Sequence, residues 1–527
     1  MNPPENWWSA NQGYASDILT LLAEAPDRDA VYWRGESFSR GDLVRSVTEA
    51  FFALRKRGVG KGDVVAVLVA SNSPEMLIVR YAANLLGGAV CYLRTTNPGT
   101  RNTVLPVEHQ IQMLQETEAI TVYTDAEGAE RAAELAKRTG IPITRLHHKG
   151  REEAVHTDVT DVPEPAAWDS GAPAVINFTS GSTGRPKGIR LSGRAWEATM
   201  RAWMDTGRQY DCASILLSTP LSHAVGALAD AVFALGGTIY LQESFDAEKF
   251  VDAVSAAKEI SWSFMATNHV FQFIDHLLER GIRDPEGVAA AGLSGLNVIP
   301  YGGSPAAPAR IAQAFDLLGP LLAQGYATSE SGHITNLTPM EHGDPKLAGT
   351  VGRPFPGVEI MVCNADSGEQ LAAGEIGEVR ARSPQMMDGY NKLPELTAQV
   401  LRDGWYSTGD IGYLDERGYL TLLGRVADVI KVGGVKVHPI VLEAEILAHP
   451  GVRHAAVYGV RDEDGSEHIH AAMECDPDAV VDVEKICAGI AESLSPIHVP
   501  EKMHVLDALP MNSNGKPDKV LLRSKYI

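Results

Sequence analysis

A strand–helix–strand pattern near residue 64 constrains the fold of this chain more than any other feature. Val64–Ala70 (VVAVLVA) is a short β-branched run, typical of a strand buried on both faces of a sheet. Ser73 and Pro74 then supply a helix N-cap and a proline in the first turn, and the apolar segment Met76–Leu86 ends at two glycines. Ala89–Leu93 (AVCYL) follows as a second strand. The pattern predicts a βαβ unit and an α/β architecture.

The rest of the chain divides into blocks that differ in their pattern of expected strands, helices and turns. Comparable strand–helix units recur to about residue 330, whereas short strands with Gly and Asp turns run from about Val351 to Leu423, as in a small barrel or sheet. After Arg425, a final block has its own strands and its own helix, Val481–Leu494. Since 527 residues exceed what one hydrophobic core usually organises, we expect at least two domains.

Charge and cysteine content argue against several classes of protein. The 46 Lys and Arg residues against 67 Asp and Glu give a net charge of −21, which argues against binding to nucleic acid or to anionic membranes. The five cysteines form no C-x-x-C pair and match no zinc spacing. The N-terminus has no basic region followed by an apolar run, and longer apolar tracts are broken by charges such as Asp230. We predict a cytoplasmic protein without stable membrane insertion.

The segment Thr179–Gly188 (TSGSTGRPKG) is the strongest candidate for an anion-binding loop. We expect it to lie between a strand, Ala174–Phe178, and a helix that begins near Ser192. Its glycines allow positive φ and close backbone approach, so N–H groups can converge on a phosphate while hydroxyls and Lys187 add donors. It is not a Walker A loop, because glycine follows Lys187. On composition alone, a Ser- and Gly-rich surface loop is equally consistent.

A series of motifs, in order along the chain, resembles the superfamily of adenylate-forming enzymes, which includes acyl-CoA synthetases, peptide-synthetase adenylation domains and firefly luciferase. TSGSTGRPKG resembles the phosphate loop of that superfamily, and the resemblance spans about residues 20–525. The further motifs are PLSHAVGAL (220–228), YGGSP (301–305), GYATSESG (325–332), YSTGD (406–410), GRVADVIKVGGVKV (424–437) and LPMNSNGK (509–516).

The resemblance implies the domain organisation of an α/β enzyme. Residues 1–424 are expected to form a large N-terminal domain that binds AMP and the acyl group, built from two α/β sheet subdomains and a small β-barrel. Residues 425–527 are expected to form a small, mobile α+β domain that carries the catalytic lysine. The implied cofactors are ATP or AMP, Mg²⁺ and coenzyme A.

The resemblance also implies the site residues. Lys516 is expected to offset the negative charge that develops when a carboxylate attacks the α-phosphate, and Asp410 to accept from both ribose hydroxyls. Glu330 is expected to bind Mg²⁺. The implied catalytic residues are Lys516, Lys187, Glu330 and His223. The implied nucleotide and coenzyme A contacts are Thr179, Ser180, Gly181, Ser182, Thr183, Gly184, Gly302, Gly303, Ser304, Gly325, Tyr326, Ala327, Thr328, Ser329, Asp410, Arg425, Gly433 and Gly434.

Each role has a purely structural alternative. The alternatives are a helix-capping acid for Glu330, a Gly-Asp turn for Asp410, a solvated hinge charge for Arg425, a lysine in a mobile Asn-Gly loop for Lys516, a satisfied pocket wall for His223 and an ordinary β-bulge for Gly434.

The implied reaction has two halves. A small-molecule carboxylic acid attacks MgATP to give acyl-AMP and pyrophosphate, and the C-terminal domain then reorients so that a thiol takes the acyl group. Ser222-His223 replaces the aspartate of amino-acid-activating domains, which disfavours an α-amino acid. The Gly- and Ala-rich segments HAVGALA and GGSPAAPA favour a bulky apolar acid. Only eleven residues follow Lys516, so an acyl carrier protein would act in trans. A homodimer is left open.

Several positions depart from the superfamily pattern. Ala327 stands where glycine is usual and adds a methyl group near the expected acyl phosphate, and Ala427 occupies the hinge position that is normally Asp or Lys. Thr267-Asn268-His269 replaces Val-Pro-Thr, and Val441 replaces an acid. Three hypotheses follow: a complete acyl-CoA ligase, which leads; a relative that performs one half-reaction or loads a carrier protein; and a non-catalytic nucleotide-binding relative, which the two lysines Lys187 and Lys516 disfavour.

Overall fold

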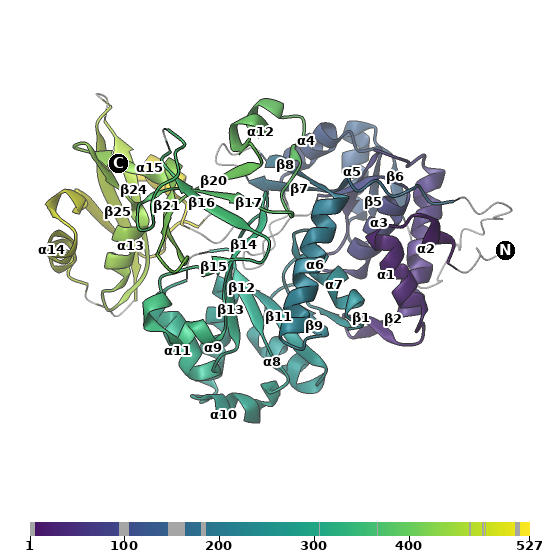
Figure 1. The fold of residues 1–527 in the computed structure, drawn as a ribbon, viewed down its shortest axis with the longest axis horizontal. Helices are drawn as coiled ribbons and strands as arrows, with labels where there is room; N and C mark the ends of the chain where they lie inside the picture. The colour runs from purple at the N-terminus through teal and green to yellow at the C-terminus, as the bar shows by residue number, and fades with distance from the viewer. Residues whose placement is uncertain are drawn as a thin grey trace. The chain divides into compact units, whose positions relative to one another are not determined.

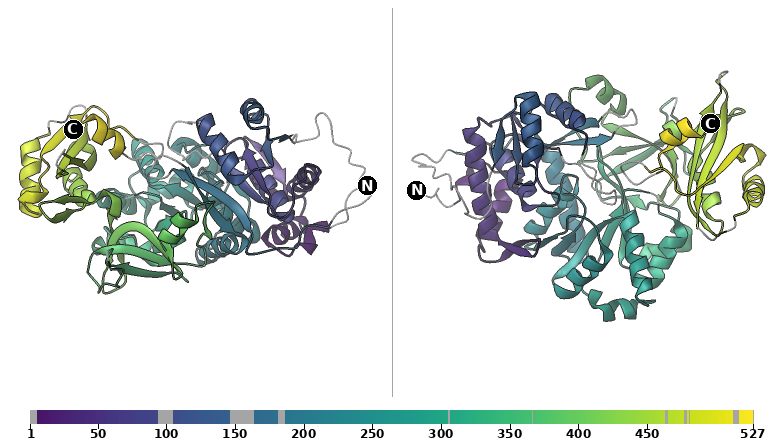
Figure 2. Two further views of the ribbon diagram at one scale, coloured as in Figure 1. Left: turned by 90° about the horizontal axis from the view of Figure 1, so that it is seen from above. Right: turned by 180° about the vertical axis from the view of Figure 1, so that it is seen from behind.

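The computed structural model describes residues 6–93, 105–145, 164–180, 186–304, 306–365, 367–462, 465–476, 479, 481–511 and 517–526. Contacts along the chain divide it into two compact units, which we describe one at a time (Figure 1, Figure 2). The first unit is Met1–Ala348, Pro354–Glu359 and Arg382–Tyr406, and the second is Gly349–Arg353, Ile360–Ala381 and Ser407–Ile527. The predicted α/β class is confirmed, since both units mix helices with sheets.

A seven-stranded sheet in the first unit contains the predicted βαβ unit. β3 (Val64–Leu68) and β4 (Ala89–Tyr92) pair in parallel, and α3 (Pro74–Leu85) connects them. Every residue of β3 is buried, as expected for a strand covered on both faces. Ser73 holds the N-cap position of α3, but its side chain makes no capping hydrogen bond. The sheet order is β18 (Gly389–Tyr390), β8 (Pro186–Ser192), β7 (Pro173–Ser180), β4, β3, β5 (Thr121–Thr124) and β6 (Ile143–Arg145).

Strand β8 corrects the expectation that Thr179–Gly188 is a loop throughout, whereas the helix expected to begin near Ser192 is confirmed as α6 (Gly193–Gln209), with Ser192 at its N-cap. Pro186–Ser192 is a strand antiparallel to β7, and α6 begins only after it. Within β8, only Ile189 and Leu191 form an apolar alternation, which is too short to predict a strand among Gly, Pro, Lys and Arg. Pairing with neighbouring strands on both sides decides its conformation.

A nine-stranded sheet forms the second layer of α/β structure. Its central strands are parallel, and its order is β15 (Arg353–Pro354), β14 (Gly332–Leu337), β13 (Leu322–Thr328), β12 (Ile299–Gly302), β11 (Ile260–Ala266), β9 (Ser214–Leu217), β10 (Ile239–Leu241), β1 (Asp29–Trp33) and β2 (Glu36–Ser39). Besides α3 and α6, the α-helices described in the first unit are α1 (Tyr14–Ala23), α2 (Arg40–Lys56), α4 (Val107–Thr117), α5 (Ala129–Thr139), α7 (Val225–Ala234), α8 (Ala247–Ala256), α9 (Thr267–Glu279), α10 (Pro285–Val288), α11 (Pro308–Leu318) and α12 (Pro394–Val400).

One apolar core connects the two sheets of the first unit. It contains Val65 of β3, Val175 of β7, Ile215 of β9 and Trp196 of α6, all buried. A second cluster packs α8, α9 and α11 against β11 and β12, and Figure 1 shows these helices gathered around that part of the sheet. The two sheets therefore pack against the same apolar core, to which α6 also contributes.

A fully buried ion pair contacts this core. Arg80 of α3 and Asp230 of α7 are both 0% exposed, and Asp230 also accepts hydrogen bonds from Tyr81 and from Trp196 at 2.7 Å. The lack of a side chain at Gly226 leaves space for Arg80, since a Cβ at Gly226 would lie 2.7 Å from Arg80 Nη1. This part of the HAVGALA segment therefore serves helix packing, and its small residues do not by themselves indicate a spacious acyl pocket.

The second unit contains strands of a five-stranded sheet and a C-terminal block with a two-stranded and a three-stranded sheet. The short strands predicted between about 351 and 423 form a five-stranded sheet, and the predicted helix near 481–494 is α14 (Val483–Ser493). A buried cluster with Ile430, Val457 and Ile486 gives this block its own core. The further elements with residues in the second unit are β16 (Glu359–Cys363), β17 (Gly377–Arg382), β20 (Trp405–Leu414), β21 (Leu420–Arg425), β22 (Ile430–Val432), β23 (Val435–Val437), α13 (Pro439–Leu447), β24 (Val452–Arg461), β25 (Glu467–Cys475), β26 (Lys502–Leu506) and α15 (Lys519–Lys525). Strand β19 (Leu401–Arg402) falls within the first unit.

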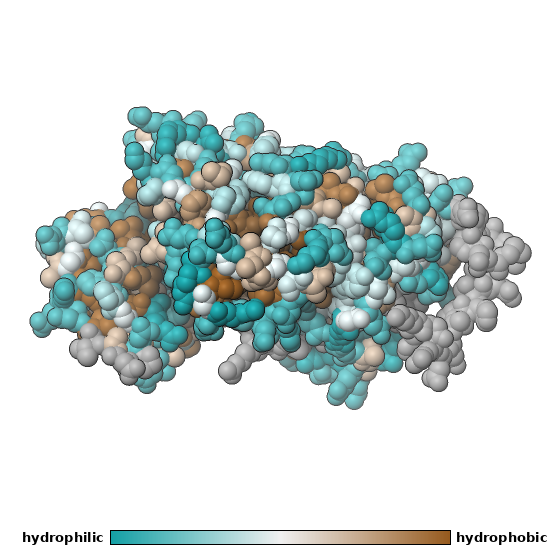
Figure 3. Space-filling view, turned by 90° about the horizontal axis from the view of Figure 1, so that it is seen from below, coloured by the Kyte–Doolittle hydropathy of each residue, from teal (hydrophilic) through white to brown (hydrophobic). Residues whose placement is uncertain are grey.

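Hydrophilic side chains cover much of the face drawn in Figure 3, with smaller hydrophobic patches between them. Throughout the described ranges, each helix is too short or too polar to traverse a bilayer.

The buried ion pair yields a prediction about stability. Asp230→Asn removes the counter-charge of Arg80, so we expect the free energy of unfolding to fall by about 3–5 kcal/mol. Urea unfolding followed by circular dichroism measures this loss. Asp205→Asn is the control, because Asp205 pairs with Arg208 on the exposed face of α6 and should cost at most about 1 kcal/mol. Equal losses in the two variants would contradict a special role for the buried pair.

Candidate active site

The hairpin of β7 and β8 presents the lysine of the predicted phosphate loop. Lys187 lies opposite Thr179 in the antiparallel register, so both flank the loop tip. The tip itself falls outside the described residues, and so does the predicted catalytic lysine. The predicted site residues that lie outside the described part of the chain are Gly181, Ser182, Thr183, Gly184 and Lys516, together with the side chain of Ser180.

Tyr390 joins two predicted site residues and was missed by the sequence analysis. Its hydroxyl donates to Glu330 Oε1 at 3.0 Å, and Lys187 Nζ lies 5.7 Å from the centroid of its ring. Gly389 and Tyr390 form the two-residue strand β18, which pairs with β8 and so brings Tyr390 to Lys187. The stretch DGYN has no helix or strand periodicity. The contact between Tyr390 and Lys187 therefore becomes evident only from the pairing of β18 with β8.

Glu330 lies in the turn between β13 and β14. The turn is fixed by Thr328, whose Oγ1 accepts from the backbone N–H of Ser331 at 3.1 Å. The carbonyl of Glu330 accepts from the N–H of Met387 at 2.7 Å. Glu330 is therefore held by its main chain and by its side chain, and the alternative of a helix-capping acid is wrong because no helix begins there.

The two glycine-rich motifs at 301–305 and 325–332, which in the resemblance correspond to the loops around the adenine, are neighbours. Gly302 at the end of β12 pairs in parallel with Gly325 on β13, and a Cβ at Gly302 would lie 2.4 Å from the carbonyl oxygen of Gly325. Gly303 follows with φ of +91°, a conformation that L side chains rarely adopt. Thr267 Oγ1 donates to the carbonyl of Ser304 at 2.9 Å and so ties the loop to α9.

The close approach of Gly302 to Gly325 yields a second prediction. Gly302→Ala must push β12 from β13 at the point where the two glycine-rich segments meet, so we expect ATP to bind about tenfold more weakly. Isothermal titration with ATP measures the change. Gly349→Ala is the matched control, because a Cβ there meets no atom within 4 Å. An unchanged affinity in Gly302→Ala would contradict the assignment of this strand end to nucleotide binding.

Ala327 borders an aromatic cluster that the sequence analysis did not find. Its partner across the ladder is His333 on β14, so the two side chains share one face of the sheet. The His333 ring lies 4.4 Å from that of Trp203 in a T-shaped contact and 5.2 Å from that of Phe355 in a stacked one. Burial lowers the pKa of His333 to about 4, so the imidazole is neutral near pH 7. The cluster is an apolar, uncharged wall.

His223 lies in the turn before α7. Burial lowers the pKa of its imidazole, and within the described residues its Nε2 has no hydrogen-bond partner. The neighbouring Ser222 is 1% exposed, and its Oγ is likewise without a partner in the described part of the chain. Polar atoms left unpaired in the protein are consistent with a ligand-facing position. The predicted role of His223 stays a prediction.

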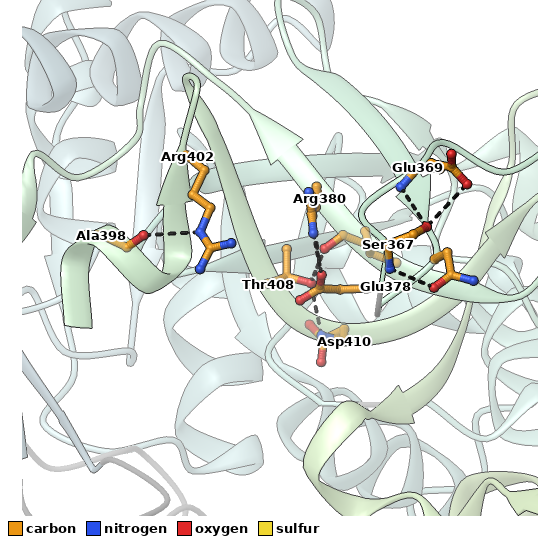
Figure 4. A network of polar contacts seen from close by, with 10 residues as sticks. Ser367, Glu369, Glu378, Arg380, Ala398, Arg402, Thr408 and Asp410 are labelled. Carbon is orange, nitrogen blue, oxygen red and sulfur yellow. Dashed lines mark hydrogen bonds and ion pairs between the residues drawn. The ribbon is translucent and has the colours of Figure 1, made fainter. Parts of the chain in front are cut away.

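In the second unit, the structure brings together the two residues assigned to the sugar. Asp410 and Arg425 are opposite one another on β20 and β21, and Arg425 Nε lies 2.7 Å from Asp410 Oδ1. The Asp410 side chain is 9% exposed and that of Arg425 57%. Thr408 Oγ1 accepts from the N–H of Asp410 at 3.0 Å and donates to the carbonyl of Val379 at 2.7 Å, and Figure 4 shows Thr408 beside Asp410. Asp410 is therefore fixed in strand β20, with an arginine beside its carboxylate.

Gly433 and Gly434 form the two-residue turn between β22 and β23. Their φ values are +55° and +83°, and Val432 pairs with Val435 across the turn. Such a turn requires positive φ at both positions, which explains why both residues are glycines. Gly434 therefore lies in a hairpin turn, and the alternative of a β-bulge at this position is wrong. Ala427 lies in the short 3-10 helix Val426–Asp428 that follows β21.

Comparison with known proteins defines the class as adenylate-forming enzymes. Residues 21–391 match the family described as AMP-binding enzyme, and residues 441–516 match the AMP-binding enzyme C-terminal domain. The first match alone covers more than half of the chain. The chain therefore belongs to the AMP-binding enzyme family, and the resemblance seen in its motifs is confirmed.

Relatives with different acceptors cover nearly the whole chain. The solved structure of amide bond synthetase McbA from Marinactinospora thermotolerans is similar with a TM-score of 0.83 and 32% identity, over 97% of this chain and 99% of that one. Feruloyl-CoA synthase from Amycolatopsis sp is 29% identical over 98% of this chain and 99% of its own length. The fatty acid–[acyl-carrier-protein] ligase ScoC from Streptomyces coeruleorubidus is 28% identical, over 95% and 94%.

Proposed function

We propose that this enzyme activates a carboxylic acid with MgATP, through an acyl-adenylate, and transfers the acyl group to the thiol of coenzyme A. The observation that carries the proposal is the contact of one tyrosine with both a lysine and a glutamate. Tyr390 touches Lys187, beside the predicted phosphate loop, and Glu330, beside the glycine-rich segment of β13. A cation for phosphate and a carboxylate for a metal ion are the groups that phosphate activation requires.

The remaining residues support roles in holding the nucleotide. Gly303 leaves room for a flat base against exposed backbone, because a Cβ there would meet no atom within 4 Å, whereas the missing side chain of Gly302 allows the close approach of β12 to β13. The carboxylate of Asp410 can accept from ribose hydroxyls, and Arg425, paired with it, adds donors for sugar or phosphate. Lys516 is proposed as the cation that offsets charge at the α-phosphate during acid attack.

The residues present fit Mg²⁺ that arrives with ATP. Across the described segments, no group of three or more His, Cys, Asp or Glu side chains could hold a metal ion. Mg²⁺ bound to a nucleotide needs only one or two protein carboxylates, because phosphates and water supply the other ligands. Glu330 offers such a carboxylate, already oriented by Tyr390. When bound, the ion offsets phosphate charge and orients the nucleotide.

The acid is proposed to be bulky and apolar. Support comes from the aromatic cluster of Trp203, His333 and Phe355, which lies on the face of β14 shared with Ala327. Burial lowers the pKa of both His333 and His223, so neither imidazole favours the binding of a second carboxylate. Asp410 and Glu330 are assigned to the nucleotide and not to a substrate ammonium, in keeping with the Ser222-His223 replacement, which disfavours an α-amino acid.

The acceptor is the part of the proposal with real alternatives. Coenzyme A is supported by the similarity to feruloyl-CoA synthase, and a carrier protein acting in trans by the similarity to ScoC. An amine is a further candidate, because McbA is named an amide bond synthetase and is 32% identical over 97% of this chain. All three acceptors would attack the same acyl-adenylate, so the first half-reaction is common to them.

One experiment separates these outcomes. The protein is incubated with MgATP and a panel of aryl, fatty and dicarboxylic acids, alone and with coenzyme A, a holo carrier protein or a primary amine. AMP, pyrophosphate, acyl-AMP, thioester and amide are followed separately. We expect pyrophosphate release with an apolar acid and thioester formation with coenzyme A. Thioester formation only from supplied acyl-AMP identifies the one-half-reaction alternative, and no ATP binding at all would overturn the proposal.

Lys516 provides a test of the two-step mechanism. In Lys516→Ala, we expect acyl-AMP formation to fall about 10²–10³-fold, because one preorganised charge donor is lost. Thioester formation from supplied acyl-AMP should change little, since the lysine acts on the first step only. Lys525→Ala, an exposed lysine of α15, is the control and should retain both steps. Equal loss of both half-reactions in Lys516→Ala would indicate a general binding or folding role.

A further inference from the structure

Tyr390 contacts two residues of opposite charge, Lys187 and Glu330. Its ring faces Lys187 Nζ at 5.7 Å and its hydroxyl donates to Glu330 Oε1 at 3.0 Å, while the residue as a whole is only 8% exposed. Among the described residues, no salt bridge joins Lys187 to Glu330, although one tyrosine touches both. Opposite charges near one protein surface attract strongly enough to pair when nothing lies between them.

The backbone keeps Tyr390 in this place. Its N–H donates to Thr397 Oγ1 at 2.9 Å, and it pairs with Ile189 on β8, two residues from Lys187. Met387, on the same segment, donates its N–H to the carbonyl of Glu330 at 2.7 Å. The segment that carries Tyr390 is therefore anchored both to the lysine strand and to the glutamate turn, which fixes the main chain from which the ring projects.

We propose that Tyr390 is a positioning residue that keeps Lys187 and Glu330 from neutralising each other and orients the Glu330 carboxylate. The inference rests on the proposed function, in which Lys187 binds phosphate and Glu330 binds Mg²⁺. A direct Lys187–Glu330 pair would occupy both groups before the nucleotide arrives. The aromatic ring stabilises the lysine as a cation without adding a negative charge. The hydroxyl engages Glu330 Oε1, as hydrogen-bonded carboxylate ligands of metals commonly are.

Two substitutions separate the contributions of the ring and the hydroxyl. Tyr390→Phe keeps the ring and removes the hydrogen bond to Glu330. Tyr390→Leu removes both, so Lys187 can reach Glu330. Affinities for ATP are measured by isothermal titration, once with EDTA and once across a range of Mg²⁺ concentrations. The readout is binding, so it does not depend on turnover.

In Tyr390→Phe, we expect the Mg²⁺ concentration that half-saturates the effect on ATP binding to rise about 10–100-fold. The affinity for ATP in EDTA should stay within about twofold of the native protein, because the ring still keeps Lys187 apart from Glu330. In Tyr390→Leu, the affinity in EDTA should also fall, by about tenfold, because Lys187 is now paired. The double variant Tyr390→Leu with Glu330→Gln should regain that affinity, since the partner of Lys187 is then neutral.

Controls distinguish this inference from a structural effect and from the proposed function itself. Tyr240→Phe removes another tyrosine–glutamate hydrogen bond, to Glu259, and should leave both affinities unchanged. Failure of the double variant to regain affinity, or unchanged binding in Tyr390→Leu with a native circular dichroism spectrum, would overturn the positioning role. If the native protein binds no ATP with or without Mg²⁺, the proposed function fails first, and with it the role of Tyr390.

Discussion

The pairing of β8 on both of its edges is the constraint on which the candidate site depends. β7 lies on one side and forms the hairpin that presents Lys187, while β18 lies on the other and comes from a segment far along the chain. This second pairing brings Tyr390 to Lys187 and, through the same segment, to Glu330. Because side chains alternate along a strand, a shift of one residue in this register would turn them to the opposite face.

Rigid packing supports that register. The fully buried pair of Arg80 and Asp230 ties α3 to α7, and Gly226 gives the arginine its space. A buried ion pair is costly to break and contributes little over an apolar alternative, so its value here lies in fixing how the helices meet. The apolar core of this unit also includes residues of α6, whose Trp203 contacts His333 on the nine-stranded sheet. Apolar walls and charged groups are thus held by one core in the first unit.

The fold indicates that a nucleotide is used to activate an acid, but it does not indicate which acceptor then takes the acyl group. Proteins named for coenzyme A, a carrier protein and amide bond formation all resemble this chain over nearly its whole length. Activation of an acid as its adenylate is chemistry that these acceptors can share, whereas the attacking thiol or amine is selected by a few local contacts. The family therefore predicts the first half-reaction better than the second.

The sequence by itself determined the α/β class, the βαβ unit at Val64–Tyr92, the C-terminal block and the family, because periodicity and ordered motifs are local properties. It also identified Asp410 and Arg425, whose pairing the structure then revealed. Tertiary structure alone decided that Pro186–Ser192 is a strand, that Glu330 lies in a hairpin turn, that Tyr390 contacts Glu330 and that His333 pairs with Ala327. These features depend on hydrogen bonds and ring contacts between segments far apart in sequence, and no local pattern encodes which distant strand will supply the partner.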